Sequence, residues 1–319
     1  MLDLAILGVG GGMPLPGRYL SSTLLNFKGR KILIDCGEGT QVSMRELGWG
    51  FKTLDIICIT HAHGDHIVGL PGLLSTIGNS GKTSPLTIIG PVGITNIVNS
   101  LRVIAPFLPY EIKTIETNNS HLRFTLKNGE LDYIDNNIEN KTYYERLDID
   151  TIVLDHSADC VGYSFKVPRT PAFDVKKAMS NNVPKNLWGV LQKGEEVLDN
   201  NILYTPDMVL GEQRDGLKLS YITDTRYLES IIDFVSESDL LISEGTYGDD
   251  ADIEKAIKNK HMTFREAATI AQKAKVNELL LTHFSPAMPN PGLFIHNARE
   301  VFPNTTLGEE KLIKKLIFK

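Results

Sequence analysis

The stretch 60-THAHGDH-66 places three histidines and an aspartate within six positions, although the whole chain has only eight histidines. It lies at the C-terminal end of DIICIT, an apolar run typical of a buried strand, and ligand sites in α/β sheets collect where strands end. Gly64 lets the chain turn, so side chains on both sides of it can converge. Imidazole and carboxylate groups are ligands that suit Zn²⁺. A hydrogen-bonded histidine cluster on a loop is the alternative, but four donors in this spacing favour metal.

Four donors are too many for one open catalytic metal, so His61, His63, Asp65 and His66 predict the start of a two-metal site. Three further predicted strands also lead to a possible ligand: TIVLDH ends in His156, KLSYIT is followed directly by Asp224, and ELLLTH ends in His283. Because the C-terminal ends of strands converge in space, these seven residues are the candidate ligands. His121, inside a strand pattern, and His296, on a helix pattern, break the rule and are expected to be ordinary structural or surface residues.

The amino-acid composition is that of an ordinary globular protein. Of 319 residues, 42% are apolar and 23% charged, and no apolar run approaches the ~20 residues of a membrane span. The start, MLDLAILGVGGG, reads as a first strand rather than a signal peptide. Cys36, Cys58 and Cys160 form no CxxC pair, which favours a reduced, cytoplasmic setting. Cys160 lies near His156 in sequence, but buried packing is expected for a lone cysteine.

The predicted elements fall into two mixed β/α halves. Short β-rich runs dominate up to residue 167, with a helix near 92–104, and the last third alternates strands with helices. No repeat or low-complexity tract is present. This organisation predicts one α/β domain over residues 1–319, with two sheets and outer helices.

The glycines after the first strand imitate a dinucleotide-binding loop. Such a loop needs a helix immediately after it, whereas Pro14 and Pro16 block a helix here and another strand follows. We therefore expect a turn that passes close to a site.

A basic island interrupts an acidic chain. Residues 164–194 hold six cations and one acid, a net charge of +5, while the rest of the chain has 27 cations and 38 acids, a net charge of −11. The overall charge of −6 argues against a general nucleic-acid binder, but an average hides a local patch. The island is either a solvated loop with ordinary lysines or a phosphate-binding surface.

The HxHxDH motif, followed by His, Asp and His at strand ends, resembles the metallo-β-lactamase superfamily. More narrowly, ILIDCGEGTQ, THAHGDHIVGLPGLL, LDHSADCVGY, TDT, EGTY and LLLTHFS make the chain similar to the short form of the ribonuclease Z family, the tRNA 3′-processing endonucleases, nearly from end to end. The resemblance implies a four-layer αβ/βα sandwich with a protruding arm. It departs at Ala287 and Met288, where that family commonly has Arg and Tyr.

The resemblance also implies roles for the candidate ligands. His61, His63 and His156 match the ligands of one zinc, and Asp65, His66 and His283 match those of the other. Asp224 matches the carboxylate that bridges two cations roughly 3.5–4 Å apart.

Three residues match catalytic positions of the family. Asp65 resembles the proton acceptor, and His261, in KNKHMTFREAA, resembles the donor that protonates the departing 3′ oxygen. Glu244, which ends DLLISE, would orient the imidazole of His261. A surface histidine at a helix start and a carboxylate bound to backbone N–H groups are the alternatives for these last two.

The basic island lies where the family has an arm that holds tRNA, which predicts an inserted tRNA-binding arm at residues 164–205. Its expected phosphate-binding residues are Lys166, Arg169, Lys176, Lys177, Lys185 and Lys193.

The expected function is zinc-dependent removal of the 3′ trailer from precursor tRNA, leaving a 3′-hydroxyl on the tRNA and a 5′-phosphate on the trailer. The resemblance implies two Zn²⁺ per subunit, a homodimer and no membrane association. The alternatives are a phosphodiesterase for small cyclic or aryl diesters and a non-catalytic RNA-binding protein on the same fold.

Overall fold

Two β-sheets pack face to face in the computed structural model, which describes residues 1–134 and 145–319. The first sheet has the strand order β17-β1-β2-β3-β4-β5-β6. Its strands are β1 (Leu2–Gly8), β2 (Ser22–Phe27), β3 (Arg30–Ile34), β4 (Leu54–Cys58), β5 (Leu86–Gly90), β6 (Ile112–Glu116) and β17 (Ile313–Leu316). From β3 to β6 the strands are parallel, so β4 ends at the same edge as its neighbours.

The second sheet has the order β16-β15-β14-β13-β10-β9-β7-β8. Its strands are β7 (His121–Lys127), β8 (Glu130–Ile134), β9 (Arg146–Leu154), β10 (Cys160–Arg169), β13 (Arg214–Ile222), β14 (Leu240–Glu244), β15 (Leu279–Thr282) and β16 (Thr305–Leu307). Strand β10 is antiparallel to both β9 and β13, and β13 to β16 are parallel. The C-terminal ends of β9, β13, β14 and β15 therefore share one edge.

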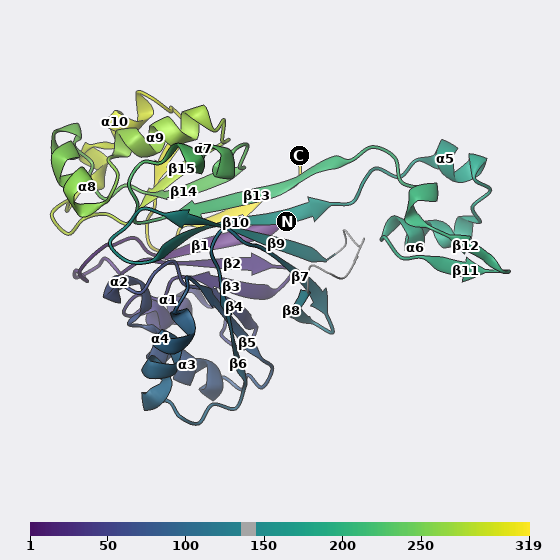
Figure 1. The fold of residues 1–319 in the computed structure, drawn as a ribbon, viewed down its shortest axis with the longest axis horizontal. Helices are drawn as coiled ribbons and strands as arrows, with labels where there is room; N and C mark the ends of the chain where they lie inside the picture. The colour runs from purple at the N-terminus through teal and green to yellow at the C-terminus, as the bar shows by residue number, and fades with distance from the viewer. Residues whose placement is uncertain (135–144) are drawn as a thin grey trace.

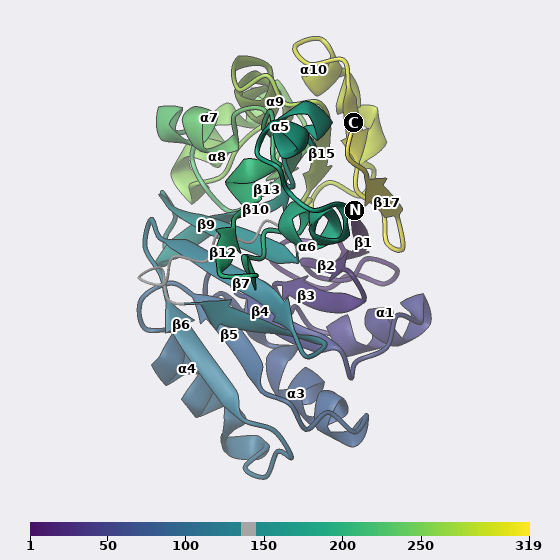
Figure 2. The same cartoon turned by 90° about the vertical axis from the view of Figure 1, so that its right-hand side faces the viewer.

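Helices cover the outer face of each sheet, which gives four layers (Figures 1 and 2). The helices on the first sheet are α1 (Thr40–Leu47), α3 (Leu70–Asn79) and α4 (Ile94–Leu101), the last continued by the 3₁₀ turn η1 (Arg102–Ile104). Those on the second are α7 (Glu229–Val235), α8 (Ile253–Asn259), α9 (Phe264–Lys273) and α10 (Ile295–Arg299), with the turns η4 (Asp250–Asp252) and η5 (Pro291–Leu293). The four-layer αβ/βα sandwich expected from the sequence is confirmed. None of the described helices combines the length and apolarity needed to cross a membrane.

The layer between the two sheets is apolar, and it fixes the position of the edge where the strand ends meet. Its buried side chains come from both sheets, among them Ile34 and Ile56 from the first and Tyr163 and Tyr221 from the second. The Tyr163 hydroxyl donates a 2.7 Å hydrogen bond to the carbonyl of Ile59. This bond ties β10 to the segment that leads into the histidine motif, so the two sheets position the site jointly.

A separate unit projects from the second sheet between β10 and β13, at the right of Figure 1. Its elements are α5 (Val175–Ser180), η2 (Lys185–Leu187), α6 (Trp188–Gln192), β11 (Val197–Asp199), β12 (Ile202–Tyr204) and η3 (Pro206–Met208). It has an apolar cluster of its own, centred on Ala178, Leu191 and Val209. We call residues 170–213 the arm; residues 164–169 of the segment expected from the sequence belong to β10 instead.

The charge of the arm is not that of the basic island. Residues 170–213 contain four lysines and six acids, a net charge of −2, because the acids at 195, 196, 199, 207 and 212 follow the basic stretch. The cations lie on or beside α5, η2 and α6, whereas Glu195, Glu196 and Asp199 lie at the β11–β12 hairpin. The positive charge is thus confined to one part of the arm.

Candidate active site

The seven candidate ligands meet at the shared edge of the two sheets. His61 and His63 follow β4, and Asp65 and His66 begin the short helix α2 (Gly64–Ile67). The other three, His156, Asp224 and His283, lie one or two residues beyond the ends of β9, β13 and β15. Strand ends that are distant in sequence are brought together because these strands run in the same direction.

The first donor group contains His61, His63, His156 and Asp224. His61 Nε2 lies 3.0 Å from His63 Nδ1, which lies 3.2 Å from His156 Nε2. The Oδ2 atom of Asp224 lies 3.6 Å from His61 Nε2 and 3.7 Å from His156 Nε2. These four atoms therefore surround a single point.

The second donor group contains Asp65, His66, His283 and again Asp224. The Nε2 atoms of His66 and His283 are 3.2 Å apart. Asp65 Oδ2 lies 3.4 Å from the former and 3.3 Å from the latter. Here it is Oδ1 of Asp224 that approaches, at 3.5 Å from His66 and 3.2 Å from His283. The two oxygens of Asp224 thus face different donor groups.

Two of these residues have backbone conformations that disfavour a side chain. Asp224 has φ 33° and His283 has φ 58°, both in the left-handed region. Such conformations cost of order 1–3 kcal/mol and persist where surrounding structure enforces them, commonly at functional sites. At both strand ends, the backbone is bent in a way that brings the donor into the cluster.

The donor groups fit bound metal ions. Two ligands ~2.05 Å from a tetrahedral zinc lie roughly 3.3 Å apart, and the nitrogen pairs at 3.0–3.2 Å come close to this spacing. Asp65 and Asp224 are buried, and within residues 1–134 and 145–319 neither has a lysine or arginine at salt-bridge distance. Since buried charges are paired or coordinate metals, this charge calls for a cation.

The buried carboxylates also shift the pKa values of the neighbouring histidines. Burial alone would lower the pKa of His66, but the carboxylates of Asp224 and Asp35 raise it well above its ordinary value. In contrast, burial and the neighbouring His66 lower the pKa of His61 to about 2, which leaves its Nε2 lone pair available. The negative charge that favours a proton on His66 would also favour a metal cation at this position.

Outer hydrogen bonds fix which nitrogen each imidazole presents. The His66 Nδ1–H donates to Asp35 at 2.8 Å, His61 Nδ1–H to the Thr60 hydroxyl at 3.1 Å, and His156 Nδ1–H to the carbonyl of Lys260 at 3.2 Å. Each bond leaves Nε2 directed at the cluster, as in metal sites generally.

Asp35 and Thr60 are functional residues that the sequence reasoning missed. Asp35 is fully buried with φ 58° and also accepts from the Thr60 N–H at 2.8 Å. It belongs to the ILIDCGEGTQ segment and directly follows β3, so the strand-end rule that located the candidate ligands also pointed to it.

The glycine loop passes close to the cluster, as the sequence indicated. The Gly12 N–H donates a 2.6 Å hydrogen bond to Asp65 Oδ2. A Cβ on Gly11 would lie 2.4 Å from His283 Cε1, so no larger residue fits there. The loop therefore holds one candidate ligand and packs against another.

His261 and Glu244 lie together beside the second donor group. The His261 Nδ1–H donates to Glu244 Oε1 at 3.2 Å, and its ring stacks on that of His283 with centroids 5.5 Å apart. Glu244 is fully buried and also accepts from the Thr225 N–H at 2.6 Å and the Met262 N–H at 3.2 Å. Burial opposes protonation of His261, but Glu244 outweighs it and raises the pKa of His261 to about 9.

Thr246 joins these groups and was also missed. Its hydroxyl donates to Glu244 Oε2 at 2.6 Å and can accept from Nδ1 of His283 at 3.0 Å. Cys160 is buried and belongs to neither donor group, and His121 and His296 are exposed and lie outside both.

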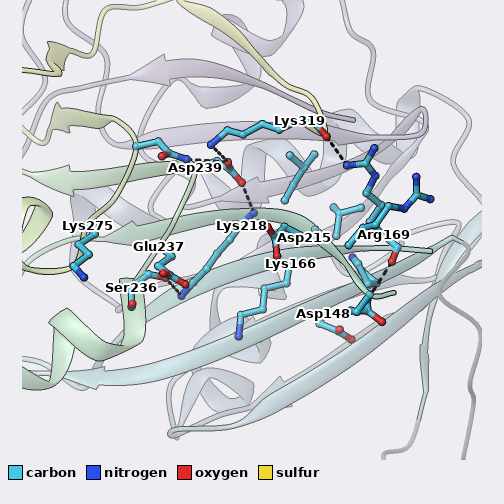
Figure 3. A pocket seen from close by; sticks show the side chains of 17 residues that line it. Asp148, Lys166, Arg169, Asp215, Lys218, Ser236, Glu237, Asp239, Lys275 and Lys319 are labelled. Carbon is cyan, nitrogen blue, oxygen red and sulfur yellow. Dashed lines mark hydrogen bonds and ion pairs between the residues drawn. The ribbon is translucent and has the colours of Figure 1, made fainter. Parts of the chain in front are cut away.

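The six expected phosphate-binding residues are not close to the cluster. Lys166 and Arg169 lie at the base of the arm and line a cavity of about 890 Å³ (Figure 3). Lys166 is paired with Asp150 at 2.6 Å, and the Arg169 guanidinium lies 5.2 Å from the ring centroid of Phe318. Their charges are therefore already engaged within the chain.

The other four lie on the arm itself, and all are exposed. The Lys177 ammonium donates to the carbonyl of Leu210 at 2.8 Å, so it also has a structural contact. For Lys176 and Lys185, no hydrogen bond or ion pair is found among the residues that the structure describes. These two are the cations best placed to meet a partner.

Family models match both halves of the chain. A model described as anti-Pycsar protein Apyc1 matches residues 2–98, and one described as a β-lactamase superfamily domain matches residues 207–284. Among solved structures, human tRNase Z, short form, aligns with a TM-score of 0.64 at 24% identity, covering 99% of this chain and 100% of that one. YhfI from Bacillus subtilis, a metallo-β-lactamase fold protein, aligns with a TM-score of 0.66 at 19% identity over 99% of this chain and 100% of that one. These similarities support the fold alone.

Curated relatives are much closer in sequence. Ribonuclease Z from Clostridium beijerinckii is 57% identical over 320 residues, and that from Clostridium botulinum (strain Alaska E43) is 54% identical over 318 residues. Each alignment covers 100% of this chain and 99% of the relative. The chain belongs to the ribonuclease Z family.

Proposed function

We propose that this protein is an endoribonuclease that removes the 3′ trailer from precursor tRNA. The cut would leave a 3′-hydroxyl on the tRNA and a 5′-phosphate on the trailer. The observation that carries the proposal is the carboxylate of Asp224, whose two oxygens face separate donor groups, in a chain 57% identical to a ribonuclease Z over its whole length. Two adjacent metal positions are the usual arrangement for in-line displacement at a phosphodiester.

The proposed cofactor is two Zn²⁺ per subunit. His61, His63 and His156 would hold one ion, Asp65, His66 and His283 the other, and Asp224 both. When bound, the ions would neutralise charge on the phosphoryl oxygens and acidify the attacking water. Nitrogen and oxygen donors at these spacings support zinc.

Asp65 would accept the proton of that water. Burial alone would raise the pKa of Asp65, but the neighbouring His283 and His66 lower it below the ordinary range, and a bound cation would act in the same direction, so the carboxylate is charged. The Gly12 N–H fixes Oδ2 at 2.6 Å, which orients the group. A charged and oriented carboxylate is what a proton acceptor requires.

His261 would donate a proton to the departing 3′ oxygen. With its Nδ1–H bound to Glu244, the imidazole has Nε2–H left for a substrate, and a pKa of about 9 keeps it protonated at neutral pH. A poor alkoxide leaving group needs such a donor, whereas an aryl oxide scarcely does. Glu244 acts through His261 by orienting it.

Lys176, Lys177, Lys185 and Lys193 on the arm, with Lys166 and Arg169 at its base, are the proposed phosphate contacts. An arm that projects from the sheet far from the cluster has no use for a small cyclic or aryl diester, which argues against that alternative. The complete donor groups argue against a non-catalytic RNA-binding protein. A homodimer and a cytoplasmic location remain predictions; light scattering on the purified protein measures the former.

The direct test is to incubate the zinc-loaded protein with a precursor tRNA and map both new ends. We expect one cut after the last nucleotide of the mature tRNA body, with a 3′-hydroxyl upstream and a 5′-phosphate downstream. A 3′-phosphate product, or no cut, would rule the proposed activity out.

Asp224→Ala is expected to lose most bound metal and nearly all activity, because one carboxylate serves both positions. Metal content by mass spectrometry should fall from two ions per chain to less than one. Asp233→Ala, on the exposed face of α7, is the matched control and should keep both ions. Two zinc ions retained in Asp224→Ala would exclude a bridging role.

His261→Ala should keep both metal ions but slow precursor cleavage by roughly 10²–10⁴-fold, the usual contribution of a general acid. The loss should be much smaller for an aryl diester, whose leaving group needs no proton. His296→Ala, an exposed helical histidine outside both donor groups, is the control. Equal losses on both substrates would show that His261 is not the acid.

The double variant Lys176→Ala/Lys185→Ala should weaken precursor binding and flatten its salt dependence by about 0.7–0.9 log units of slope for each phosphate that the arm no longer neutralises. The control, Lys52→Ala/Lys113→Ala, removes the same charge from exposed positions on the first sheet's side of the molecule. Binding titrations over a range of salt concentrations measure both. If the two double variants behave alike, only net charge matters and the arm makes no local contact.

A further inference from the structure

A cavity of about 370 Å³ opens directly beside the candidate active site. Its walls come from two loops, 246–255 and 285–294, which begin two residues after Glu244 and His283. Thr246 belongs to both the candidate active site and the cavity. Its hydroxyl lies 3.0 Å from His283 Nδ1 and 3.3 Å from His261 Nδ1, and the residue also lines the cavity. A group in this cavity would therefore lie next to the reacting phosphate.

One part of the cavity wall is apolar and closely packed. Tyr247, Met288 and Phe294 line it, and Met288 is buried. Gly248 packs against the last two so closely that a Cβ there would lie 2.6 Å from Met288 Sδ and 2.7 Å from Phe294 Cβ. The Tyr247 hydroxyl accepts a 2.6 Å hydrogen bond from the Asn259 amide, which holds the ring in place.

The charges around the cavity exclude a phosphate. Asp249 and Asp252 line it, and the one cation among the lining residues, Lys255, is paired with Asp252 at 2.6 Å. The lining is thus net negative, and the paired lysine adds no free positive charge. A neutral planar group suits these walls better than an anion does.

We propose that the cavity binds the base of the last nucleotide retained on the tRNA, by stacking against Tyr247. The inference rests on the proposed function, in which His261 protonates the 3′ oxygen of that nucleotide. The Tyr247 ring centroid lies 6.3 Å from that of His261, close enough for one nucleotide to place its 3′ oxygen at His261 and its base on Tyr247. The first trailer nucleotide lies across the phosphate from this oxygen.

The size and chemistry of the cavity agree with one base. Its volume is near the lower end of ligand pockets, which span ~300–1,000 Å³. Base–aromatic stacking tolerates every base, because each has a π-face. The cavity would therefore detect that a base is present and unpaired rather than which base it is.

The first test uses the zinc-loaded wild-type protein and three precursor tRNAs. One is intact, one has an abasic site at the last retained nucleotide, and one has an abasic site at the first trailer nucleotide. We expect kcat/KM to fall roughly 5- to 150-fold for the second, as on losing one stacked base, and little for the third. Unchanged cleavage of the second, or an equal or larger loss for the third, overturns the proposal.

The second test fills the cavity. Ala287 is exposed and lines it, so Ala287→Phe places a ring where the base would lie. In this variant the intact precursor and the precursor with the abasic site at the last retained nucleotide should be cleaved with nearly the same kcat/KM. Ala251→Phe, an exposed alanine outside the lining, should keep the wild-type ratio.

The outcomes separate the two proposals. If the wild-type protein does not cut the intact precursor, the proposed function fails and the base site fails with it. If it cuts the intact precursor but Ala287→Phe still distinguishes intact from abasic RNA, the function stands and the cavity has another role.

Discussion

The buried carboxylate of Asp224 is the constraint on which the rest of the site depends. It has no lysine or arginine partner within the described residues, and its two oxygens contact four histidines at 3.2–3.7 Å. Charge at such depth is costly unless a cation compensates it. The left-handed backbone at Asp224 and His283, the inward-facing nitrogens and the close approach of the glycine loop all converge on the space where that charge is balanced.

Hydrogen bonds behind the imidazoles make this arrangement specific. Asp35, Thr60 and the Lys260 carbonyl accept from the outer nitrogens of three histidines, so the inner lone pairs are presented without rotation of the rings. Thr246 links Glu244 to His283 through one hydroxyl. The acid–base pair and the donor groups therefore share supports, and a change at Thr246 would disturb both.

The sequence predicted the donors well because they follow strand ends, and parallel strands bring such ends together. Asp35 and Thr246 also follow strand ends, one residue after β3 and two after β14. Their position alone could not show that they hydrogen-bond to a candidate ligand from behind, because those contacts join segments far apart in the chain. Short elements were also missed: β16, β17, α1 and α2 have only three to eight residues, too few for periodicity to be distinctive. Charge counting located basic residues but not the arm, because two of them belong to β10 and the acids of the hairpin lie beyond the counted window.

Strand β13 begins at the base of the arm with Arg214 and leads directly to Asp224. At ~3.3 Å per residue, this stretch of about ten residues spans about 30 Å. Paired with β10 along its length, it is a stiff spacer between the arm and the cluster within one chain. A molecule that touches both ends must itself be about that long. The fold thus sets a minimum length for any substrate that uses both, which a mononucleotide or an aryl diester cannot meet and a folded RNA can.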